Sequence, residues 1–383
     1  MRIEREIIAA LGAKAPWAAV PLVHAVICAQ AGAHFTALEG GLAGAFSLTS
    51  LLTSAWGDIA SRRAVSGEGE SGELWAAMWA SVAPSLLLAL ALAAVGAAAG
   101  AGSAAWAAWA AVSVASADNA AINVLLRFVR KGGGEGRMTA LRNGWRSAGG
   151  NALGASLAAV AGAGEWSLLV GGVVGVVGGW CTVLPYVVAR VPYAPRLAHL
   201  PRLWEAGVRE RVKSELATAA DLTLFNAAYA ACPVEAQAAW SALRRALKVA
   251  GHAAIPVGVA ADRYIARGDG EELRRVIRAQ AILAIPAAAL LAVAYTPAAL
   301  WVSATLAIAL TIAMFTGQDA LYAYGQERAM ARASVVGSAV SATLVVAALA
   351  GVLEPSYALL AGSVVAGCGA DAALCAIALW RRR

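Results

Sequence analysis

This sequence has few charged residues for its length. Only 14% of its 383 residues are charged, whereas 60% are hydrophobic and the mean hydropathy is +0.67. Soluble proteins carry about 25% charged residues, because they must cover much of their surface with polar groups. The composition therefore excludes an ordinary water-soluble protein and indicates a chain whose main solvent is lipid.

Sequence signatures of common enzyme chemistry are also missing. The chain has only four lysines and no Gly-x-x-x-x-Gly-Lys-Ser/Thr phosphate loop, so ATP hydrolysis is not expected. It lacks a Gly-x-Ser-x-Gly elbow, and its His and Cys residues do not have metal-ligand spacing. The five cysteines form no Cys-x-x-Cys pair and are predicted to be packing residues. We therefore expect no enzyme activity, catalytic residue, metal site or cofactor.

What the sequence does contain is a series of long apolar stretches. A helix of about 20 residues crosses the roughly 30 Å hydrocarbon core of a bilayer, and the alanine and leucine richness speaks against a membrane barrel. The sequence predicts an all-α integral membrane protein with about twelve transmembrane helices. The predicted spans are 16–34, 38–56, 75–98, 104–125, 145–163, 166–189, 215–232, 236–257, 279–296, 298–317, 333–352 and 356–379.

The positive charges between these spans fall in alternate links. Arg2, Arg62, Arg130 and Arg190 are examples, whereas the intervening links carry acidic residues such as Glu165. Short cytoplasmic loops retain Lys and Arg, so both termini are predicted to be cytoplasmic, in a multi-pass protein of the plasma membrane. This topology explains the pI of about 9.4 without a nucleic-acid partner.

The sequence also contains an internal duplication. After the second span come Gly57, Ala60, Arg62, Gly67-Glu68-Gly69-Glu70 and Glu73-Leu74; after the eighth come Gly258, Ala261, Arg263, Gly268-Asp269-Gly270-Glu271 and Glu272-Leu273. Asp118 likewise has Asp319 as its counterpart. We predict two parallel six-helix bundles, 1–195 and 196–383, separated by the Pro- and Arg-rich link 190–214. Because each holds an even number of helices, a pseudo-twofold axis along the membrane normal should relate them.

These repeated loops resemble those of the multidrug/oligosaccharidyl-lipid/polysaccharide flippase superfamily, in particular its polysaccharide-exporter branch with the O-antigen and lipid II flippases. The stretch from Tyr322-Ala323-Tyr324-Gly325-Gln326-Glu327-Arg328 through Glu354-Pro355-Ser356-Tyr357 to Gly362 resembles the same branch, and Asp221 is similar to an acid often seen in its seventh span. The resemblance implies two bundles forming a V, with alternating access of a central cavity. It also implies movement of a polyprenyl-pyrophosphate-linked sugar across the membrane. The first span offers only His24 and Gln30, whereas the drug-exporting branch tends to carry an acid there.

Cations within the eighth predicted span are the main candidates for substrate binding. They are Arg244, Arg245, Lys248 and His252. At about 1.5 Å per residue from Glu235, Arg244 lies roughly 14 Å into the core, where a charge normally faces a wet cavity or a partner. Arg245, Lys248 and His252 share one helix face and could bind a pyrophosphate or an acidic sugar. An ion pair with Asp221, Asp118 or Glu215, or snorkelling to the inner surface, remains the alternative.

Other polar residues interrupt the apolar spans. Asn123 and Asn226 are candidate substrate contacts, and Asp118, Asp221 and His24 are candidates for coupling transport to H⁺ or Na⁺. Hydrogen bonding between helices is the alternative for all five.

Three functions are compatible with these observations. The first is a flippase or exporter of a lipid-linked oligosaccharide or polysaccharide precursor, with membrane lipid and an anionic lipid-linked glycan as partners. The second is a cation-coupled exporter of small molecules or drugs. The third is a membrane-embedded polyprenyl-phosphate transferase using Asp118 or Asp221 with bound metal, which the duplicated halves argue against.

Overall fold

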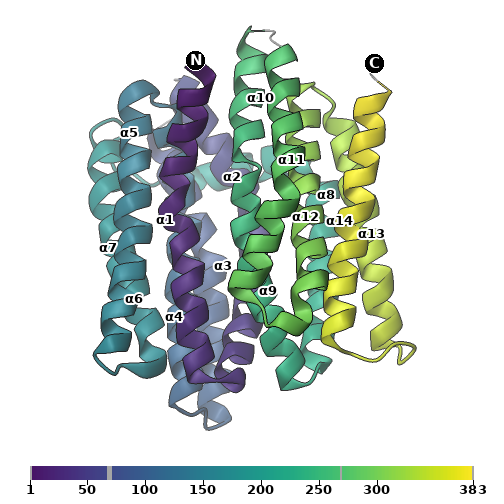
Figure 1. Cartoon of the computed structure of the whole chain (residues 1–383). Helices are drawn as coiled ribbons and strands as arrows, with labels where there is room; N and C mark the ends of the chain where they lie inside the picture. Colours follow the sequence, from purple (N-terminus) through teal and green to yellow (C-terminus); the bar gives the residue numbers. More distant parts are fainter. Residues whose placement is uncertain (1, 67–70, 268–269, 382–383) are drawn as a thin grey trace. The chain divides into compact units, whose positions relative to one another are not determined.

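The structure of this chain, a computed structural model, describes residues 2–66, 71–267 and 270–381 (Figure 1). Within these ranges every regular element is a helix, which confirms the all-helical prediction. The helices of the first half are α1 (Arg2–Ala31), α2 (Ala33–Ser66), α3 (Ser71–Ala98), α4 (Ser103–Lys131), α5 (Gly133–Gly144), α6 (Gly150–Val160) and α7 (Ser167–Val188). Those of the second half are α8 (Leu200–Ala231), α9 (Val234–Ala253), α10 (Ile255–Arg267), α11 (Gly270–Tyr295), α12 (Trp301–Ala323), α13 (Glu327–Leu349) and α14 (Tyr357–Trp380).

Seven helical segments among the described residues are long and apolar enough to cross a membrane. They are Gly72–Ala98, Ser103–Arg130, Gly164–Val188, Gly270–Tyr295, Ala298–Ala323, Glu327–Leu349 and Tyr357–Trp380. A shorter apolar segment, Pro16–Ala31, lies in α1. Every predicted span overlaps a helix, so the chain is a multispan helical protein, while the count of about twelve crossings stays a prediction.

Three predicted boundaries are wrong in detail. The span 145–163 does not begin a helix, because α5 continues into α6 through a π-helical turn at Trp145–Gly149. The span 236–257 is divided at Ala254, where α9 ends before α10 begins. The link 190–214 is helical from Leu200 onward, so α8 is much longer than the predicted span 215–232.

The chain forms two compact units. One comprises Val26–Ala219, and the other combines Met1–Ala25 with Ala220–Arg383. The first part of α1 therefore packs with C-terminal helices; the Tyr295 hydroxyl of α11, for example, donates a 3.3 Å hydrogen bond to the Ala18 carbonyl. The predicted division into 1–195 and 196–383 stays a prediction about bundle architecture.

The unit Val26–Ala219 is built around a core of α3, α4 and α7, with Leu74, Trp75, Leu125 and Val183 almost fully buried. Helices α6 and α7 approach each other closely. A Cβ atom built on Gly171 would lie 2.6 Å from the Ala155 Cβ, so only glycine fits there without displacement of the backbone. Gly175, one turn further along, is similarly close to Asn151, so Gly171-x-x-x-Gly175 is a helix-packing motif.

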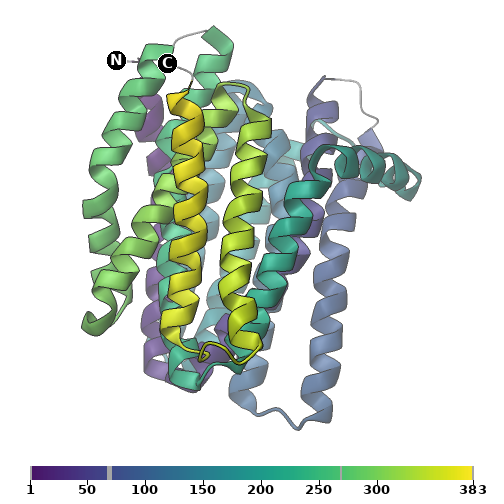
Figure 2. The same cartoon turned by 90° about the vertical axis from the view of Figure 1, so that its right-hand side faces the viewer.

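The second unit has a core formed by α9, α12 and α14, with Leu243, Ile308, Ile312 and Leu360 buried. Figure 2 shows α13 and α14 lying antiparallel and side by side. Their closest approach is at two glycines, because a Cβ on Gly337 would lie 2.8 Å from the Gly367 carbonyl oxygen. This pair brings the polar side chains of α13 and α14 together.

The two repeated sequence segments begin corresponding helices. Leu74 near the start of α3 and Leu273 near the start of α11 are 0% and 1% exposed. In the first copy, Arg63 of α2 forms a two-pronged ion pair with Glu73 of α3, with N–O distances of 2.9 and 3.1 Å. The loop residues Gly67-Glu68-Gly69-Glu70 and Gly268-Asp269, on which much of the repeat rests, lie outside the described residues.

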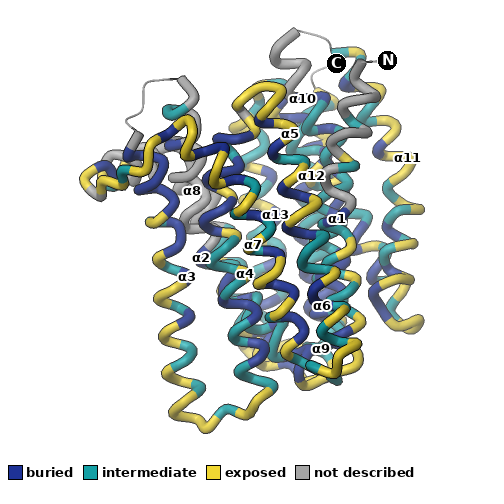
Figure 3. Tube along the Cα trace, turned by 90° about the vertical axis from the view of Figure 1, so that its left-hand side faces the viewer, coloured by how far each residue is buried: buried dark blue, intermediate teal, exposed yellow. Residues whose placement is uncertain are grey.

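Figure 3 shows exposed residues along α3 and α11, and many of them are large and apolar. On α3 these include Leu87 and Leu90, each 67% exposed, and on α11 they include Ile282 and Leu290. A soluble protein would bury such side chains, whereas lipid solvates them. These faces are the expected lipid contacts.

Candidate functional site

A buried carboxylate on α14 is the centre of the best-defined polar site. Asp371 is 3% exposed. Its Oδ2 accepts a 2.8 Å hydrogen bond from Gln318 Nε2 of α12, and its Oδ1 accepts a 3.2 Å bond from the Cys375 thiol one turn further along α14. Both carboxylate oxygens therefore have donors, as a buried acid requires.

Glycines on the neighbouring helices create the space for this carboxylate. A Cβ on Gly337 of α13 would lie 3.0 Å from the Asp371 Cβ, and one on Gly317 of α12 would lie 2.7 Å from the Cys375 Cβ. Small residues allow helices in a membrane to approach closely, and the polar groups between them can then form bonds. The sequence thus places Asp371 against both α12 and α13.

A second carboxylate belongs to the same polar site. Asp221 of α8 is half-buried and lies near Ser341 of α13, and Ser341 itself lies against the close approach of α13 and α14. Asp221 Oδ1 is inaccessible to solvent and has no hydrogen-bond partner among the described residues. Both Asp221 and Asp371 lie near enough to Cys368 of α14 to act on its thiol electrostatically. We call Asp221, Ser341, Gln318, Asp371 and Cys375 the acidic cluster.

The acidic cluster combines two carboxylates with neutral polar side chains. Its polar groups come from four helices, and one carboxylate oxygen still needs a donor or a cation. Acids within membrane-spanning helices are expensive to keep charged and are commonly used for proton or sodium coupling. Among the described residues there is no group of three or more His, Cys, Asp or Glu that could hold a metal ion.

Sequence reasoning found Asp221 but missed Asp371 and Gln318. Asp371 lies in the middle of the predicted span 356–379, so the rule that singled out Asp118 and Asp221 applies to it equally. Gln318 lay just beyond the predicted end of the span 298–317, whereas α12 continues to Ala323. Extending that span would have placed Gln318 inside the helix.

The other predicted coupling acid has a different environment. Asp118 on α4 is half-buried, and its Oδ1 accepts a 2.7 Å hydrogen bond from the Trp180 indole of α7. Asn123, five residues further along α4, is exposed. Asp118 thus joins two helices of the unit Val26–Ala219, and Asn123 does not belong to that contact.

The four basic residues of α9 that were predicted to bind substrate differ in burial. Arg245 is 6% exposed, Lys248 is exposed, and Arg244 and His252 are half-buried. The Arg245 charge acts on the Tyr295 hydroxyl of α11, so the buried guanidinium faces the interior of its own unit. The shared face inferred from spacing therefore contains one buried, one exposed and one half-buried basic residue, namely Arg245, Lys248 and His252.

Two further predicted residues lie in the same unit. Asn226 of α8 is half-buried, and its Nδ2 has no partner among the described residues. It lies one residue from Phe225, whose ring packs 4.8 Å from that of Trp240 on α9. His24 is half-buried on α1.

Comparison with solved structures identifies the fold. The sequence itself matches no protein-family model and no curated protein. The chain is similar to the lipid II flippase MurJ in an inward closed conformation, with a TM-score of 0.64 and 12% identity over 97% of this chain and 87% of that one.

Two further similarities concern multidrug transporters. The eukaryotic MATE transporter AtDTX14 gives a TM-score of 0.63 at 12% identity, covering 99% of this chain and 95% of that one. An inward-facing multidrug resistance MATE family transporter of the MOP superfamily gives 0.57 at 15% identity, covering 98% and 97%. The chain has the fold of these transporters over almost its entire length. The resemblance indicated by the sequence motifs is confirmed at the level of the fold.

Proposed function

We propose that this protein is a membrane transporter that moves a lipid-linked oligosaccharide or polysaccharide precursor across the plasma membrane by alternating access. The observation that carries the proposal is the end-to-end similarity to MurJ and MATE transporters, at TM-scores of 0.64 and 0.63. In this proposal the chain crosses the membrane about twelve times with both termini in the cytoplasm. Two six-helix bundles, 1–195 and 196–383, are related by a pseudo-twofold axis.

The α9 cations give the proposal its substrate class. Arg244, Arg245, Lys248 and His252 would attract the pyrophosphate of an anionic lipid-linked glycan, and Asn123 and Asn226 would contact the sugar. Arginine binds phosphate through paired, charge-assisted hydrogen bonds, which lysine and histidine extend with single contacts. Lys248, the exposed cation of this set, is the one most accessible to such a substrate.

The test is leaflet exchange in reconstituted vesicles. Purified protein should accelerate the translocation of a fluorescent polyprenyl-pyrophosphate disaccharide, and Lys248→Gln should reduce the rate, whereas Arg328→Gln should not. Both cations are exposed, but Arg328 lies in the first turn of α13 and belongs to no predicted substrate contact. The orientation of the protein in the vesicles is verified first. If vesicles with the wild-type protein then exchange the lipid no faster than protein-free vesicles, the flippase assignment is wrong.

The acidic cluster favours a second candidate, a cation-coupled exporter of small molecules. Asp221 and Asp371 lie in one cluster, Asp118 lies on α4 of the other unit, and His24 remains a further coupling candidate. H⁺ or Na⁺ would be the coupling ion, since protonation or ion binding neutralises an acid within the hydrocarbon. Right-side-out vesicles that contain the protein should then accumulate less of a cationic dye under an imposed ion gradient than they do without the gradient. The same assay with lipid-linked substrate distinguishes the two candidates.

A further inference from the structure

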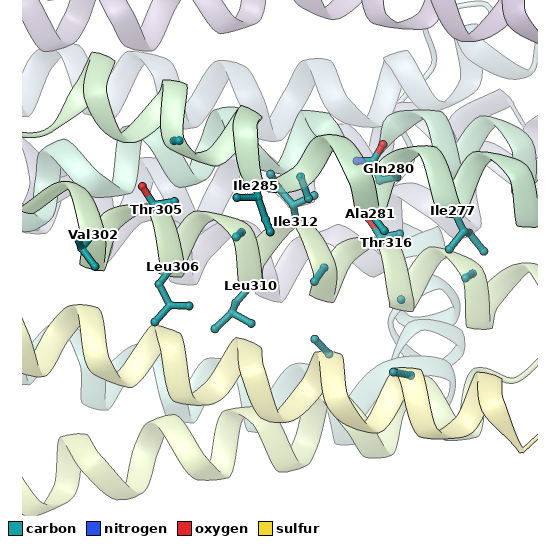
Figure 4. A pocket seen from close by; sticks show the side chains of 18 of the residues that line it. Ile277, Gln280, Ala281, Ile285, Val302, Thr305, Leu306, Leu310, Ile312 and Thr316 are labelled. Atoms are coloured by element: carbon teal, nitrogen blue, oxygen red, sulfur yellow. The ribbon is translucent and has the colours of Figure 1, made fainter.

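A long apolar groove lies between α11, α12 and α14, on the surface of the unit Met1–Ala25 and Ala220–Arg383. Its cavity volume is about 820 Å³ (Figure 4). Ile277 and Ile285 of α11 and Leu306 and Leu310 of α12 are among its lining residues, and only Gln280, Thr305 and Thr316 supply polar side chains. All three helices are long and apolar enough to span a membrane, so the groove opens toward lipid rather than water.

Helices α11 and α12 line the whole groove, whereas α14 lines only part of it, which we call the three-walled part. Helix α14 lines it through Ala372, Ala376 and Leu379, near its C-terminal end. Closer to the middle of α14, Leu310 closes the gap, since a Cβ on Gly369 would lie 3.6 Å from its Cδ1. From Ala372 to Leu379 the helix rises about 10 Å, which is within the roughly 15 Å depth of one leaflet. The three-walled part thus fits chains of one leaflet.

The end of the groove where α11 begins is cationic. Arg274 and Arg278 are both exposed. Arg274 precedes the lining residues Ile277 and Ala281 by three and seven positions, and Arg278 precedes Ala281 by three. Residues separated by three, four or seven positions share a helix face, so Arg274 and Arg278 continue the lining stripe of α11. The charge pattern predicts that this end is cytoplasmic, where anionic lipid headgroups attract arginines.

A polar group lies just inside this cationic end. Thr316 of α12 lines the groove, is 8% exposed, and its hydroxyl has no hydrogen-bond partner among the described residues. Figure 4 shows Thr316 beside Ala281, which is one helical turn beyond Arg278. Because that hydroxyl is inaccessible, an occupant of the groove would meet an apolar wall at this depth.

We propose that the groove binds one anionic phospholipid of the cytoplasmic leaflet, at a site separate from the α9 cations and the acidic cluster. Arg274 and Arg278 hold its phosphate, and its acyl chains lie between α11, α12 and α14. The one-leaflet length of the three-walled part favours a phospholipid over a polyprenyl chain, which would extend past Leu310 along α11 and α12.

The test is native mass spectrometry of the full chain in detergent, titrated with phosphatidylglycerol, phosphatidylcholine or a polyprenyl phosphate. Phosphatidylglycerol should bind in preference to phosphatidylcholine. Arg274→Gln and Arg278→Gln should each weaken that binding about fivefold, as expected for one arginine near an anionic lipid. Arg328→Gln, an exposed arginine of α13 outside the groove, should leave it unchanged.

Bulky substitutions test the groove itself. Ala376→Trp and Ala281→Trp should fill the three-walled part and remove the bound lipid. Ile377→Trp is the matched control, because Ile377 is the neighbouring exposed residue and does not line the groove. Helicity and thermal unfolding verify that each variant folds.

Two results would overturn the proposal. The first is equal phosphatidylglycerol binding in Ala376→Trp, Ala281→Trp and Ile377→Trp. The second is preferential binding of polyprenyl phosphate, if Ala289→Trp abolishes that binding. Ala289 lies in the part of the groove formed by α11 and α12 alone, so this result would assign the groove to a long isoprenoid chain. Because binding is measured without transport, the outcome is independent of the flippase assay.

Discussion

The Gln318 side-chain amide donates a 2.8 Å hydrogen bond to Asp371 Oδ2 and so joins α12 to α14. Asp371 is 3% exposed, and the partner of a buried carboxylate cannot be replaced by water as it could at a surface. This bond links the stability of the C-terminal unit to the acidic cluster, and it can be measured separately from transport.

Replacing Gln318 by Leu should destabilise the protein by about 1–3 kcal/mol, because Asp371 Oδ2 loses its donor while remaining buried. The double variant Gln318→Leu/Asp371→Leu should lose less than the sum of the two single variants, since no unpaired charge remains. Tryptophan fluorescence during thermal unfolding in detergent provides the measurement. Gln326→Leu is the control, as that side chain makes no capping hydrogen bond at the start of α13. Strict additivity would show that the bond contributes nothing specific.

Asp371→Asn and Asp221→Asn should remove the dependence of transport on pH or Na⁺. An amide cannot release a proton and carries no charge, so each variant should behave at every pH as the wild type does with that acid protonated. We expect a transport rate lower by about tenfold under an imposed gradient, equivalent to ~1.4 kcal/mol. Glu354→Gln, an exposed acid in the α13–α14 link, should retain the wild-type dependence. If both cluster variants also retain it, coupling resides elsewhere.

Gly171→Ala should destabilise the unit Val26–Ala219 by about 1–3 kcal/mol, because the added Cβ would lie 2.6 Å from both the Ala155 Cβ and the Asn151 carbonyl oxygen. Gly172→Ala is a closely matched control. A Cβ there meets nothing within 4 Å, so the change in stability should stay within about 0.5 kcal/mol. The two variants are compared by their thermal unfolding midpoints. Equal midpoints would mean that α6 and α7 are not held at this distance.

Trp180→Phe should cost about 1–3 kcal/mol, because it removes the indole N–H that donates the 2.7 Å bond to Asp118. Asp118→Asn should be milder, since the amide oxygen can still accept that bond. Asp118→Leu should approach the cost of Trp180→Phe, because the indole donor then has no partner. If Asp118→Asn unfolds the protein as readily as Asp118→Leu, its negative charge and not its acceptor oxygen stabilises α4 against α7.

The sequence predicted the helices well where apolar length alone decides them. It predicted them less well where packing decides: the π-helical turn at Trp145–Gly149 depends on how α5 and α6 lie against α7, and no local residue pattern demands it. The same limit applies to the candidate site. Spacing places Arg245 and Lys248 on one face of α9, but only the neighbouring helices determine that the first is buried and the second exposed.

The acidic cluster shows a different limit. Asp221 and Asp371 lie 150 positions apart in the sequence, and their association depends on Gly337 and Gly367 allowing α13 to meet α14. Each acid can be recognised in the sequence as a charged residue within an apolar span. That the two acids belong to one cluster cannot be predicted from the sequence, because that requires knowing which helices are neighbours and which faces they share.

Both connections between the two compact units pass through unbroken helix: the divisions at Ala25/Val26 and Ala219/Ala220 fall inside α1 and α8. Neither connection contains a loop that could serve as a flexible hinge. A rearrangement of one unit against the other would therefore have to bend α1 and α8. Pro21 removes one backbone hydrogen bond from α1 just before its division, which lowers the resistance to bending there. No proline occurs in α8 beyond its first turn, so α8 should resist bending more than α1 does.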